Sequence, residues 1–276
     1  MINFIKVEIF FENTPFTPPV FLGSMLRGAF GVSLKKVVCI NPSYKCDGCF
    51  AKENCLFYEF FEQKNSFHPF RFDVKLYPEN FDFGFYLFEN ATDKLPYILS
   101  TFHKMLTEQG LGVNRETIQI KEIRCNDQVV YNGRSFDLGN VFEEEFEEGE
   151  FHSDIKLLFI TPLRMKYQNR LLREKPKLDF LLQSIYNRYR ELKKFDKKKL
   201  PFDPSYEESS SSVYFKDLTR YSNRQKTKMQ IGGILGEIEY KGIDKESFRL
   251  LKLGELIGAG KQTVFGMGKI RVEEKK

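Results

Sequence analysis

The chain has 276 residues, of which 41% are hydrophobic and 29% charged, a composition that excludes both a disordered polypeptide and a membrane-embedded bundle. Its length, about twice the commonest domain size, predicts two domains. No stretch approaches the ~18 uncharged apolar residues of a spanning helix. Met1–Phe10 lacks the basic and apolar segments of a signal peptide. We therefore expect a cytoplasmic protein without a membrane partner.

Charge divides the chain into two unlike halves. Residues 1–150 carry 15 Lys and Arg against 22 Asp and Glu, a net charge of −7, whereas residues 151–276 carry 28 against 16, a net charge of +12. Such a cation excess attracts polyanions, so nucleic acid is the first partner to consider; a solvated basic surface is the alternative. The acidic run Glu143–Glu150 is too self-repelling for a core, and we place the boundary between domains 1–150 and 151–276 there.

Apolar periodicity in the first half predicts the order strand, helix, strand, strand, helix, strand, with an insertion of residues 39–61 after the first helix. The predicted segments are strand Asn3–Phe11, helix Leu22–Val38, strands Phe70–Leu76 and Phe81–Phe88, helix Thr92–Gln109 with Thr92 as N-cap and Gly110 as its stop, and strands Ile118–Ile123 and Val129–Tyr131.

The second half repeats this order. The predicted segments are strand Phe151–Thr161, helix Lys177–Lys194, a flexible loop at Ser209–Ser212, strands Val213–Tyr221 and Gly233–Tyr240, helix Asp244–Ile257 and strand Met267–Val272. Two tandem βαββαβ units predict an α+β protein of two ferredoxin-like domains, the arrangement that RNA-recognition modules also use.

Four of the five cysteines lie close together in the insertion. With the spacing C-x6-C-x2-C-x5-C, they are Cys39, Cys46, Cys49 and Cys55. Four thiolates close a tetrahedral shell around zinc and leave no open position for water, so we predict a structural zinc site and no catalytic metal. An iron–sulfur cluster uses the same ligands, and reduced, metal-free thiols are the further alternative. Cys125 stands alone and is predicted to lie in the core.

A glycine-rich segment precedes the last predicted strand. Its glycines are Gly254, Gly258, Gly260, Gly266 and Gly268, interleaved with Lys261 and Lys269. It is not a nucleotide-binding P-loop, because Glu255 replaces the first glycine and Gln262 follows the lysine. Backbone without a Cβ can approach an anion closely, so we predict that amides and lysines here hold a phosphate chain; a helix cap with a tight turn is the alternative.

Cations interleaved with tyrosines surround this segment in the sequence. They are Arg164, Lys166, Arg170, Arg173, Lys175, Lys177, Arg220, Arg224, Lys226 and Lys228, with Tyr167, Tyr214 and Tyr221 between them. Cations suit phosphates and aromatic rings suit unstacked bases, so this pattern favours single-stranded or hairpin RNA.

Several short blocks occur together along nearly the whole chain. They are Leu26–Gly31 (LRGAFG), Tyr58–Glu62 (YEFFE), His68–Phe70 (HPF), Gly110–Gly112 (GLG), Thr161–Arg164 (TPLR), Tyr221–Gln225 (YSNRQ) and Gly258–Gly268. In this order and spacing the chain resembles the CRISPR-associated repeat-processing endoribonucleases of the RAMP superfamily, in a subgroup with an N-terminal four-cysteine insertion.

The resemblance implies tandem ferredoxin-like domains, a C-terminal glycine-rich loop that contacts RNA, and metal-independent cleavage of CRISPR repeat transcripts into guide RNAs. The implied reaction is attack of a 2′-hydroxyl on the adjacent phosphate, which leaves a 2′,3′-cyclic phosphate and a 5′-hydroxyl. Repeat RNA is the implied partner, with a CRISPR effector complex as a further one, and the protein is expected to be a monomer or homodimer. A non-catalytic RNA-binding subunit of such a complex is the alternative.

The catalytic residues are harder to assign, because Val32 stands where similar members often carry a histidine after the LRGAFG block. We therefore predict His68 as the histidine of the site; a turn residue that hydrogen-bonds backbone before Pro69 is the alternative interpretation of this side chain. Lys35 and Lys36 are the alternative catalytic groups, which would stabilise the phosphorane and protonate the leaving oxygen instead. Arg27 joins the predicted RNA contacts.

Overall fold

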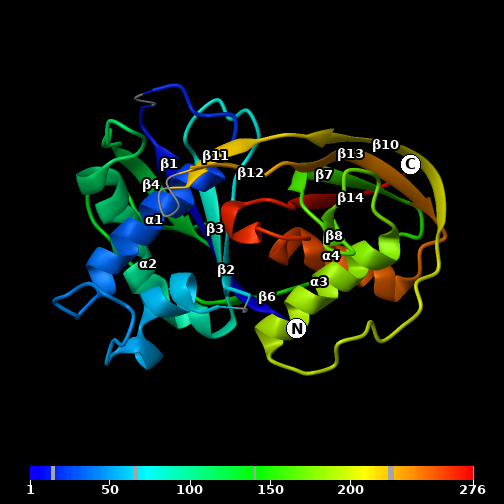
Figure 1. The fold of residues 1–276 in the computed structure, drawn as a ribbon, viewed down its shortest axis with the longest axis horizontal. Helices are drawn as coiled ribbons and strands as arrows, with labels where there is room; N and C mark the ends of the chain where they lie inside the picture. The colour runs from blue at the N-terminus through cyan, green and yellow to red at the C-terminus, as the bar shows by residue number, and fades with distance from the viewer. Residues whose placement is uncertain (14–15, 65–66, 140, 223–226, 276) are drawn as a thin grey trace. The chain divides into compact units, whose positions relative to one another are not determined.

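The structure is a computed structural model that describes residues 1–13, 16–64, 67–139, 141–222 and 227–275 (Figure 1). The chain divides into two compact units, one of residues 2–145 and one of residues 146–276 together with Met1. No helix in the described part of the chain is long and apolar enough to cross a membrane.

The N-terminal unit is built on an antiparallel sheet with the strand order β2-β3-β1-β4-β5, and β6 pairs with the start of β1. Its elements are β1 (Asn3–Phe11), α1 (Gly23–Val38), β2 (Phe70–Asp73), β3 (Phe83–Phe88), α2 (Leu95–Lys104), β4 (Ile120–Cys125), β5 (Gln128–Tyr131) and β6 (Glu144–Glu145). The order β2-β3-β1-β4 with two crossover helices is the predicted ferredoxin-like topology.

Phenylalanine fills the core between this sheet and its helices. Alternate residues of β1, such as Val7 and Ile9, are fully buried. The ring of Phe30 on α1 lies 5.2 Å from that of Phe85 on β3 and 5.0 Å from that of Phe102 on α2. Many of the 29 phenylalanines therefore serve packing, with edge and tilted ring contacts that add to their burial.

The second predicted helix of this unit is not continuous. Residues Glu89–Lys94 form a 3₁₀ turn, α2 follows, and Met105–Gln109 form a π turn that ends at Gly110 with φ +70°. Thr92 is not an N-cap, because its hydroxyl donates to the Glu89 carbonyl at 2.9 Å inside the 3₁₀ turn. The prediction of Gly110 as the stop is confirmed, since its positive φ is readily adopted only by glycine.

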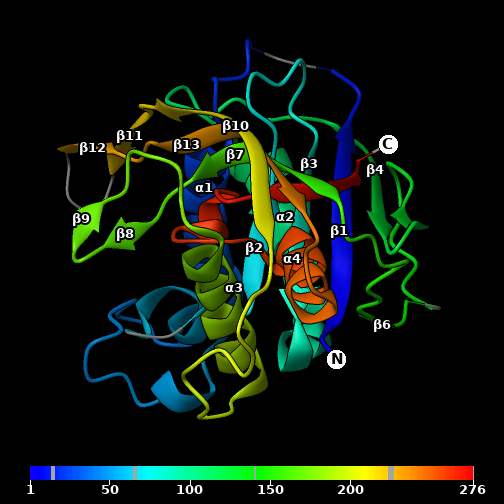
Figure 2. The same ribbon diagram turned by 90° about the vertical axis from the view of Figure 1, so that its right-hand side faces the viewer.

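The C-terminal unit repeats the topology in a four-stranded antiparallel sheet with the order β10-β13-β7-β14. Its elements are β7 (Ile155–Leu163), β8 (Lys166–Tyr167), β9 (Arg170–Leu171), α3 (Leu178–Lys193), β10 (Glu207–Lys216), β11 (Thr219–Ser222), β12 (Thr227–Gln230), β13 (Gly233–Lys241), α4 (Lys245–Ile257) and β14 (Ile270–Glu274). Helices α3 and α4 pack against each other (Figure 2). The hairpins β8–β9 and β11–β12 extend beyond the βαββαβ core.

The prediction of a flexible loop at Ser209–Ser212 is wrong. These serines belong to β10, and Ser210, Ser211 and Ser212 are in register with Glu239, Ile238 and Glu237 of β13. Strand formation depends here on backbone pairing at the edge of the sheet, and small polar side chains are compatible with it because both faces of this stretch are exposed. The predicted strand Val213–Tyr221 is also divided, since β10 ends at Lys216 and Thr219 begins a separate hairpin.

Candidate functional site

In the N-terminal unit the candidate site begins with the exposed face of α1. Gly28, Val32 and Lys36 follow one another at four-residue spacing, and all three are exposed. Because residues four apart lie above one another on a helix, Lys36 is one turn beyond Val32 on the same face. Val32 has 51% of its surface exposed, so the position that carries a histidine in similar proteins points toward solvent here.

The neighbouring face of α1 is covered by the π turn Tyr58–Glu62 and the residue before it. A Cβ at Gly31 would lie 2.6 Å from the ring of Phe61, so only glycine leaves room for that ring. Phe61 stacks on Phe57 at 5.2 Å. The Arg27 guanidinium lies 4.7 Å from the Phe61 centroid and the Lys35 ammonium 4.8 Å from that of Phe57. Both predicted functional cations therefore contact rings of their own chain.

His68 is oriented by the same insertion. Its Nδ1 lies 3.1 Å from the carbonyl oxygen of Glu59, and its ring stacks on Phe70 at 6.0 Å. A carbonyl oxygen only accepts, so Nδ1 is the protonated nitrogen and the neutral ring carries its lone pair on Nε2. A general base that takes a proton on Nε2 requires this tautomer.

The other two histidines are engaged elsewhere. His103 on α2 packs edge-on against Tyr131 and Phe136, both at 5.8 Å. His152 places Nδ1 3.6 Å from a carboxylate oxygen of Glu274.

The four clustered cysteines are half-buried free thiols. Asn41 lies among them: its carbonyl accepts from Cys39 Sγ at 3.7 Å, and its side-chain amide donates to Cys49 Sγ at 3.5 Å. Within the described residues, no three or more His, Cys, Asp or Glu side chains are arranged to hold a metal ion. This arrangement does not fit the predicted zinc shell, and zinc stays a prediction. Cys125 is fully buried, and burial raises its thiol pKa to about 12.

In the C-terminal unit the glycine-rich segment is packed against the unit's own backbone, and Gly258, Gly260, Gly266 and Gly268 are all buried. A Cβ at Gly260 would lie 2.6 Å from the Arg164 carbonyl oxygen, and one at Gly268 would lie 1.8 Å from that of Ala259. Both glycines also have positive φ, at 73° and 69°. Packing inside the unit is therefore enough to require glycine at Gly260 and Gly268, and their contact with RNA stays a prediction.

The amides of this segment are largely engaged inside the unit. Gly260 N donates to Ser184 Oγ at 3.0 Å, Lys261 N to Arg164 O at 2.7 Å and Gly268 N to Pro162 O at 3.1 Å. Thr161 closes the loop, because its hydroxyl donates to Gly266 O at 2.7 Å and accepts from Lys269 N at 2.9 Å. The charged side chains of this loop reach the surface instead: Lys261 is exposed and Lys269 is half-buried.

Two arginines fasten the hairpin region around this loop. Arg164 donates through Nη1 to the Gly232 carbonyl at 2.8 Å, and Arg220 of β11 lies 4.9 Å over the ring of Phe265. Burial lowers the pKa of both guanidinium groups. They hold the hairpin and the loop together while remaining partly accessible.

The remaining predicted RNA contacts lie mostly on exposed hairpins. Arg170 is exposed on β9, and Arg173 lies 4.4 Å over the ring of Phe215 and 3.8 Å from Asp217. Arg224 and Lys226 lie outside the described residues, as does the side chain of Lys228. Sequence reasoning did not predict that Thr161 and Ser184 fix the loop, because their partners Gly266 and Gly260 lie 105 and 76 residues away along the chain.

The chain thus consists of two ferredoxin-like units, of which the second lies in the strongly basic half and carries an internally braced glycine-rich loop. Residues 157–270 match the family model described as CRISPR-associated endoribonuclease Cas6, and residues 3–145 match a model named AF_1859_N, described as an N-terminal domain. Residues 157–270 therefore belong to the Cas6 endoribonuclease family, and residues 3–145, just over half of the chain, belong to the family of the AF_1859_N model.

Similar proteins span the same length. An uncharacterized protein of Archaeoglobus fulgidus is 24% identical over 294 residues, covering 97% of this chain and 96% of the relative. The solved structure of Thermus thermophilus Cas6 (TTHB231) is 15% identical with a TM-score of 0.56, covering 99% and 98% of the two chains. A structure titled "An RAMP protein binding different RNA substrates" is 13% identical with a TM-score of 0.53, covering 99% and 100%. At these identities the structures show a shared tandem ferredoxin-like fold.

Proposed function

We propose that this protein is a metal-independent endoribonuclease that cleaves CRISPR repeat transcripts into guide RNAs. The observation that carries the proposal is the match of residues 157–270 to an endoribonuclease family, over the half of the chain with a net charge of +12. A positive half of this size supplies the sequence-independent part of RNA binding. Similar solved structures titled as a Cas6 product complex, a Cas6 substrate mimic complex and a RAMP protein binding different RNA substrates support RNA as the ligand.

The proposed reaction is an in-line transesterification. The 2′-oxygen forms a bond to the adjacent phosphorus while the bond from phosphorus to the 5′-oxygen breaks, so the products are a 2′,3′-cyclic phosphate and a 5′-hydroxyl. A base takes the 2′-hydroxyl proton, an acid gives one to the leaving 5′-oxygen, and cations offset the negative charge of the phosphorane.

The N-terminal unit offers groups for each role. His68, with its lone pair on Nε2, suits the base. Lys36, exposed one turn beyond Val32, suits charge stabilisation and proton donation, and Lys35 beside Phe57 supports the positive potential of the same helix end. In the C-terminal unit Lys261 and Lys269 suit the RNA phosphates.

One observation favours a second candidate, a non-cleaving RNA-binding subunit of a CRISPR complex. Val32 leaves the exposed face of α1 without an imidazole, and a valine cannot accept or donate a proton. Such a subunit would have the same fold and the same basic half but would bind RNA without cleaving it.

Incubation of the protein with repeat RNA from its own genome in excess EDTA separates the two candidates. Cleavage to cyclic-phosphate and 5′-hydroxyl ends, blocked by a single 2′-deoxy substitution at the cleaved position, is the expected result. His68→Gln and Lys36→Gln should lower the single-turnover rate by about 10²-fold or more, with His152→Gln as the matched control. RNA that is bound but intact points to the subunit, and cleavage only with added metal overturns the proposal.

A further inference from the structure

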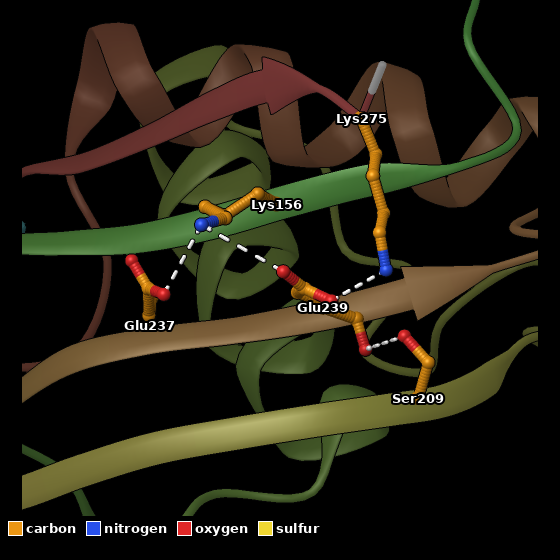
Figure 3. Close-up of polar contacts among 5 residues, drawn as sticks. All are labelled: Lys156, Ser209, Glu237, Glu239 and Lys275. Atoms are coloured by element: carbon orange, nitrogen blue, oxygen red, sulfur yellow. Dashed lines mark hydrogen bonds and ion pairs between the residues drawn. The ribbon is translucent and has the colours of Figure 1, made fainter.

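The cations on the exposed face of the C-terminal sheet are already paired. Lys156 of β7 lies 3.1 Å from Glu237 and 3.7 Å from Glu239, and Lys275 lies 2.5 Å from Glu239 (Figure 3). Ser209 of β10 donates to the Glu239 carbonyl. The hydrogen bond that Lys156 donates to Glu237 raises the pKa of Lys156, and the one that Lys275 donates to Glu239 lowers the pKa of Glu239, so these groups stay charged. This face is close to electrically balanced and is a poor surface for a polyanion.

A run of three unpaired lysines follows α3 in the described part of the chain. Residues 193–199 read KKFDKKK, and Lys194, Lys197, Lys198 and Lys199 are exposed. In the described part of the chain no ion pair is found for Lys197, Lys198 or Lys199. Lys193 and Lys194 sit at the C-terminal end of α3, where a cation stabilises the helix dipole. The three lysines beyond the helix have no such structural reason.

The segment that carries them is fixed to α3 by specific contacts. Gln183 donates through Nε2 to the Lys198 carbonyl at 3.0 Å and accepts through Oε1 from Leu200 N at 3.1 Å. Phe195 packs against Tyr186 and Tyr189 at 5.9 and 5.5 Å. A merely solvated lysine surface needs no such pinning, whereas a fixed backbone reduces the entropy lost when the lysines bind a ligand.

The same turn of α3 also holds the glycine-rich loop. Ser184, the residue after Gln183, accepts from Gly260 N at 3.0 Å, and Lys261 follows Gly260 directly. Consecutive helix residues therefore anchor the two cationic segments of this unit, one through Lys198 and the other through Gly260.

We infer that Lys197, Lys198 and Lys199 form a second binding surface for the sugar–phosphate backbone of RNA, fixed by the same helix, α3, that holds the glycine-rich loop. The inference rests on the proposed function, because it assumes that RNA is the polyanion. Contacts of this kind are independent of base sequence and set affinity and register without touching the reacting phosphate.

The test is the triple variant Lys197→Gln/Lys198→Gln/Lys199→Gln, which keeps side-chain length and removes the charge. Its matched control is Lys121→Gln/Lys241→Gln/Lys245→Gln, three exposed lysines elsewhere. For the first variant the slope of log affinity against log salt should become shallower by about 2 to 3, with affinity for repeat RNA falling at least about tenfold at low salt. The cleavage rate with RNA saturated by protein should not change.

A second variant, Gln183→Ala, keeps every lysine and releases the pinned backbone, so it should show a smaller loss of affinity. Melting curves of each variant check that the fold is retained. If both triple variants show the same salt slope and affinity, the second surface is refuted while the proposed function stands. If the unmodified protein neither binds nor cleaves repeat RNA, both are refuted.

Discussion

Gly31 determines how the insertion can lie on α1. Phe61 occupies the space that a Cβ would take, at 2.6 to 3.1 Å from three of its ring atoms. Gly28, one turn earlier in the same helix, has nothing within 4 Å of a Cβ position. Glycine is therefore required at Gly31 by the packing of Phe61, whereas the structure shows no requirement for glycine at Gly28.

Gly31→Ala is expected to lower the free energy of unfolding by about 1 to 3 kcal/mol, because the added methyl forces Phe61 and its neighbours apart. Gly28→Ala is the matched control and should stabilise the protein by up to about 1 kcal/mol through helix propensity. Urea unfolding of both variants measures this. Equal effects of the two substitutions would show that Phe61 does not pack on Gly31.

A Cβ at Gly260, in the C-terminal unit, would also clash, here with the backbone carbonyl oxygen of Arg164. A backbone carbonyl has less freedom to move than a ring, and φ at Gly260 is +73°. Gly260→Ala should therefore cost more than Gly242→Ala, which has φ +59° and open space and carries only the ~1 to 2 kcal/mol penalty of a left-handed residue. Thermal unfolding measures the loss of stability in both variants. Equal losses would mean that the glycine-rich loop shifts easily to admit the added methyl group.

At the scale of elements, hydrophobic alternation predicted most of the fold. Asn3–Phe11 was predicted as a strand with the bounds of β1, because burial on one face and exposure on the other follow directly from alternating residues. The strand at Ser209–Ser212 was not predicted, because β10 is held in the sheet by backbone hydrogen bonds to β13. The polar side chains of these serines indicate only that both faces of the strand are exposed to solvent.

The candidate site was predictable in part for similar reasons. Lys261, Lys269 and the hairpin arginines were found because charge is visible in the sequence. The hydroxyls of Ser184 and Thr161 were not, because a hydrogen bond between residues 76 or 105 positions apart leaves no local pattern. His68 was found, but its tautomer depends on the Glu59 carbonyl, which no spacing rule reveals.

The cysteine segment gives a prediction about an element as a whole. If zinc binds, the four cysteine thiolates must come together, and Asn41 must release Cys49 Sγ, to which its side-chain amide donates. Elemental analysis of the purified protein should then find about one zinc per chain. Cys46→Ser/Cys49→Ser should lose the metal and melt at lower temperature.

Cys125→Ser is the control for this experiment, since it places a hydroxyl in the core without touching the predicted ligands. It should lower the melting temperature and leave the zinc content unchanged. Native protein without zinc or iron would end the metal prediction and favour reduced thiols as the resting state.

At the scale of the whole molecule, only some of the excess positive charge is free of carboxylate partners and so able to bind a polyanion. The C-terminal half carries a net charge of +12, yet Lys156 and Lys275 on the exposed sheet face are bound to Glu237 and Glu239. In the part of the chain that the structure describes, the cations without a carboxylate partner include Arg170 of β9, Lys261 of the glycine-rich loop and Lys197–Lys199 after α3. A polyanion lowers its energy where cations lack carboxylate partners, so we expect RNA on these cations and not on the paired face of the sheet.

Acetylation of lysines with and without bound repeat RNA, mapped by mass spectrometry, tests this partition across the chain. RNA should reduce the labelling of Lys261 and of Lys197–Lys199 several-fold, because phosphates cover their ammonium groups, and should leave Lys156 and Lys275 unchanged. Raising the salt concentration to dissociate the RNA should restore labelling at the protected lysines, since the protecting contacts are ionic. Protection of Lys156 and Lys275 with Lys261 still reactive would place the RNA on the exposed sheet face and overturn the argument from charge pairing.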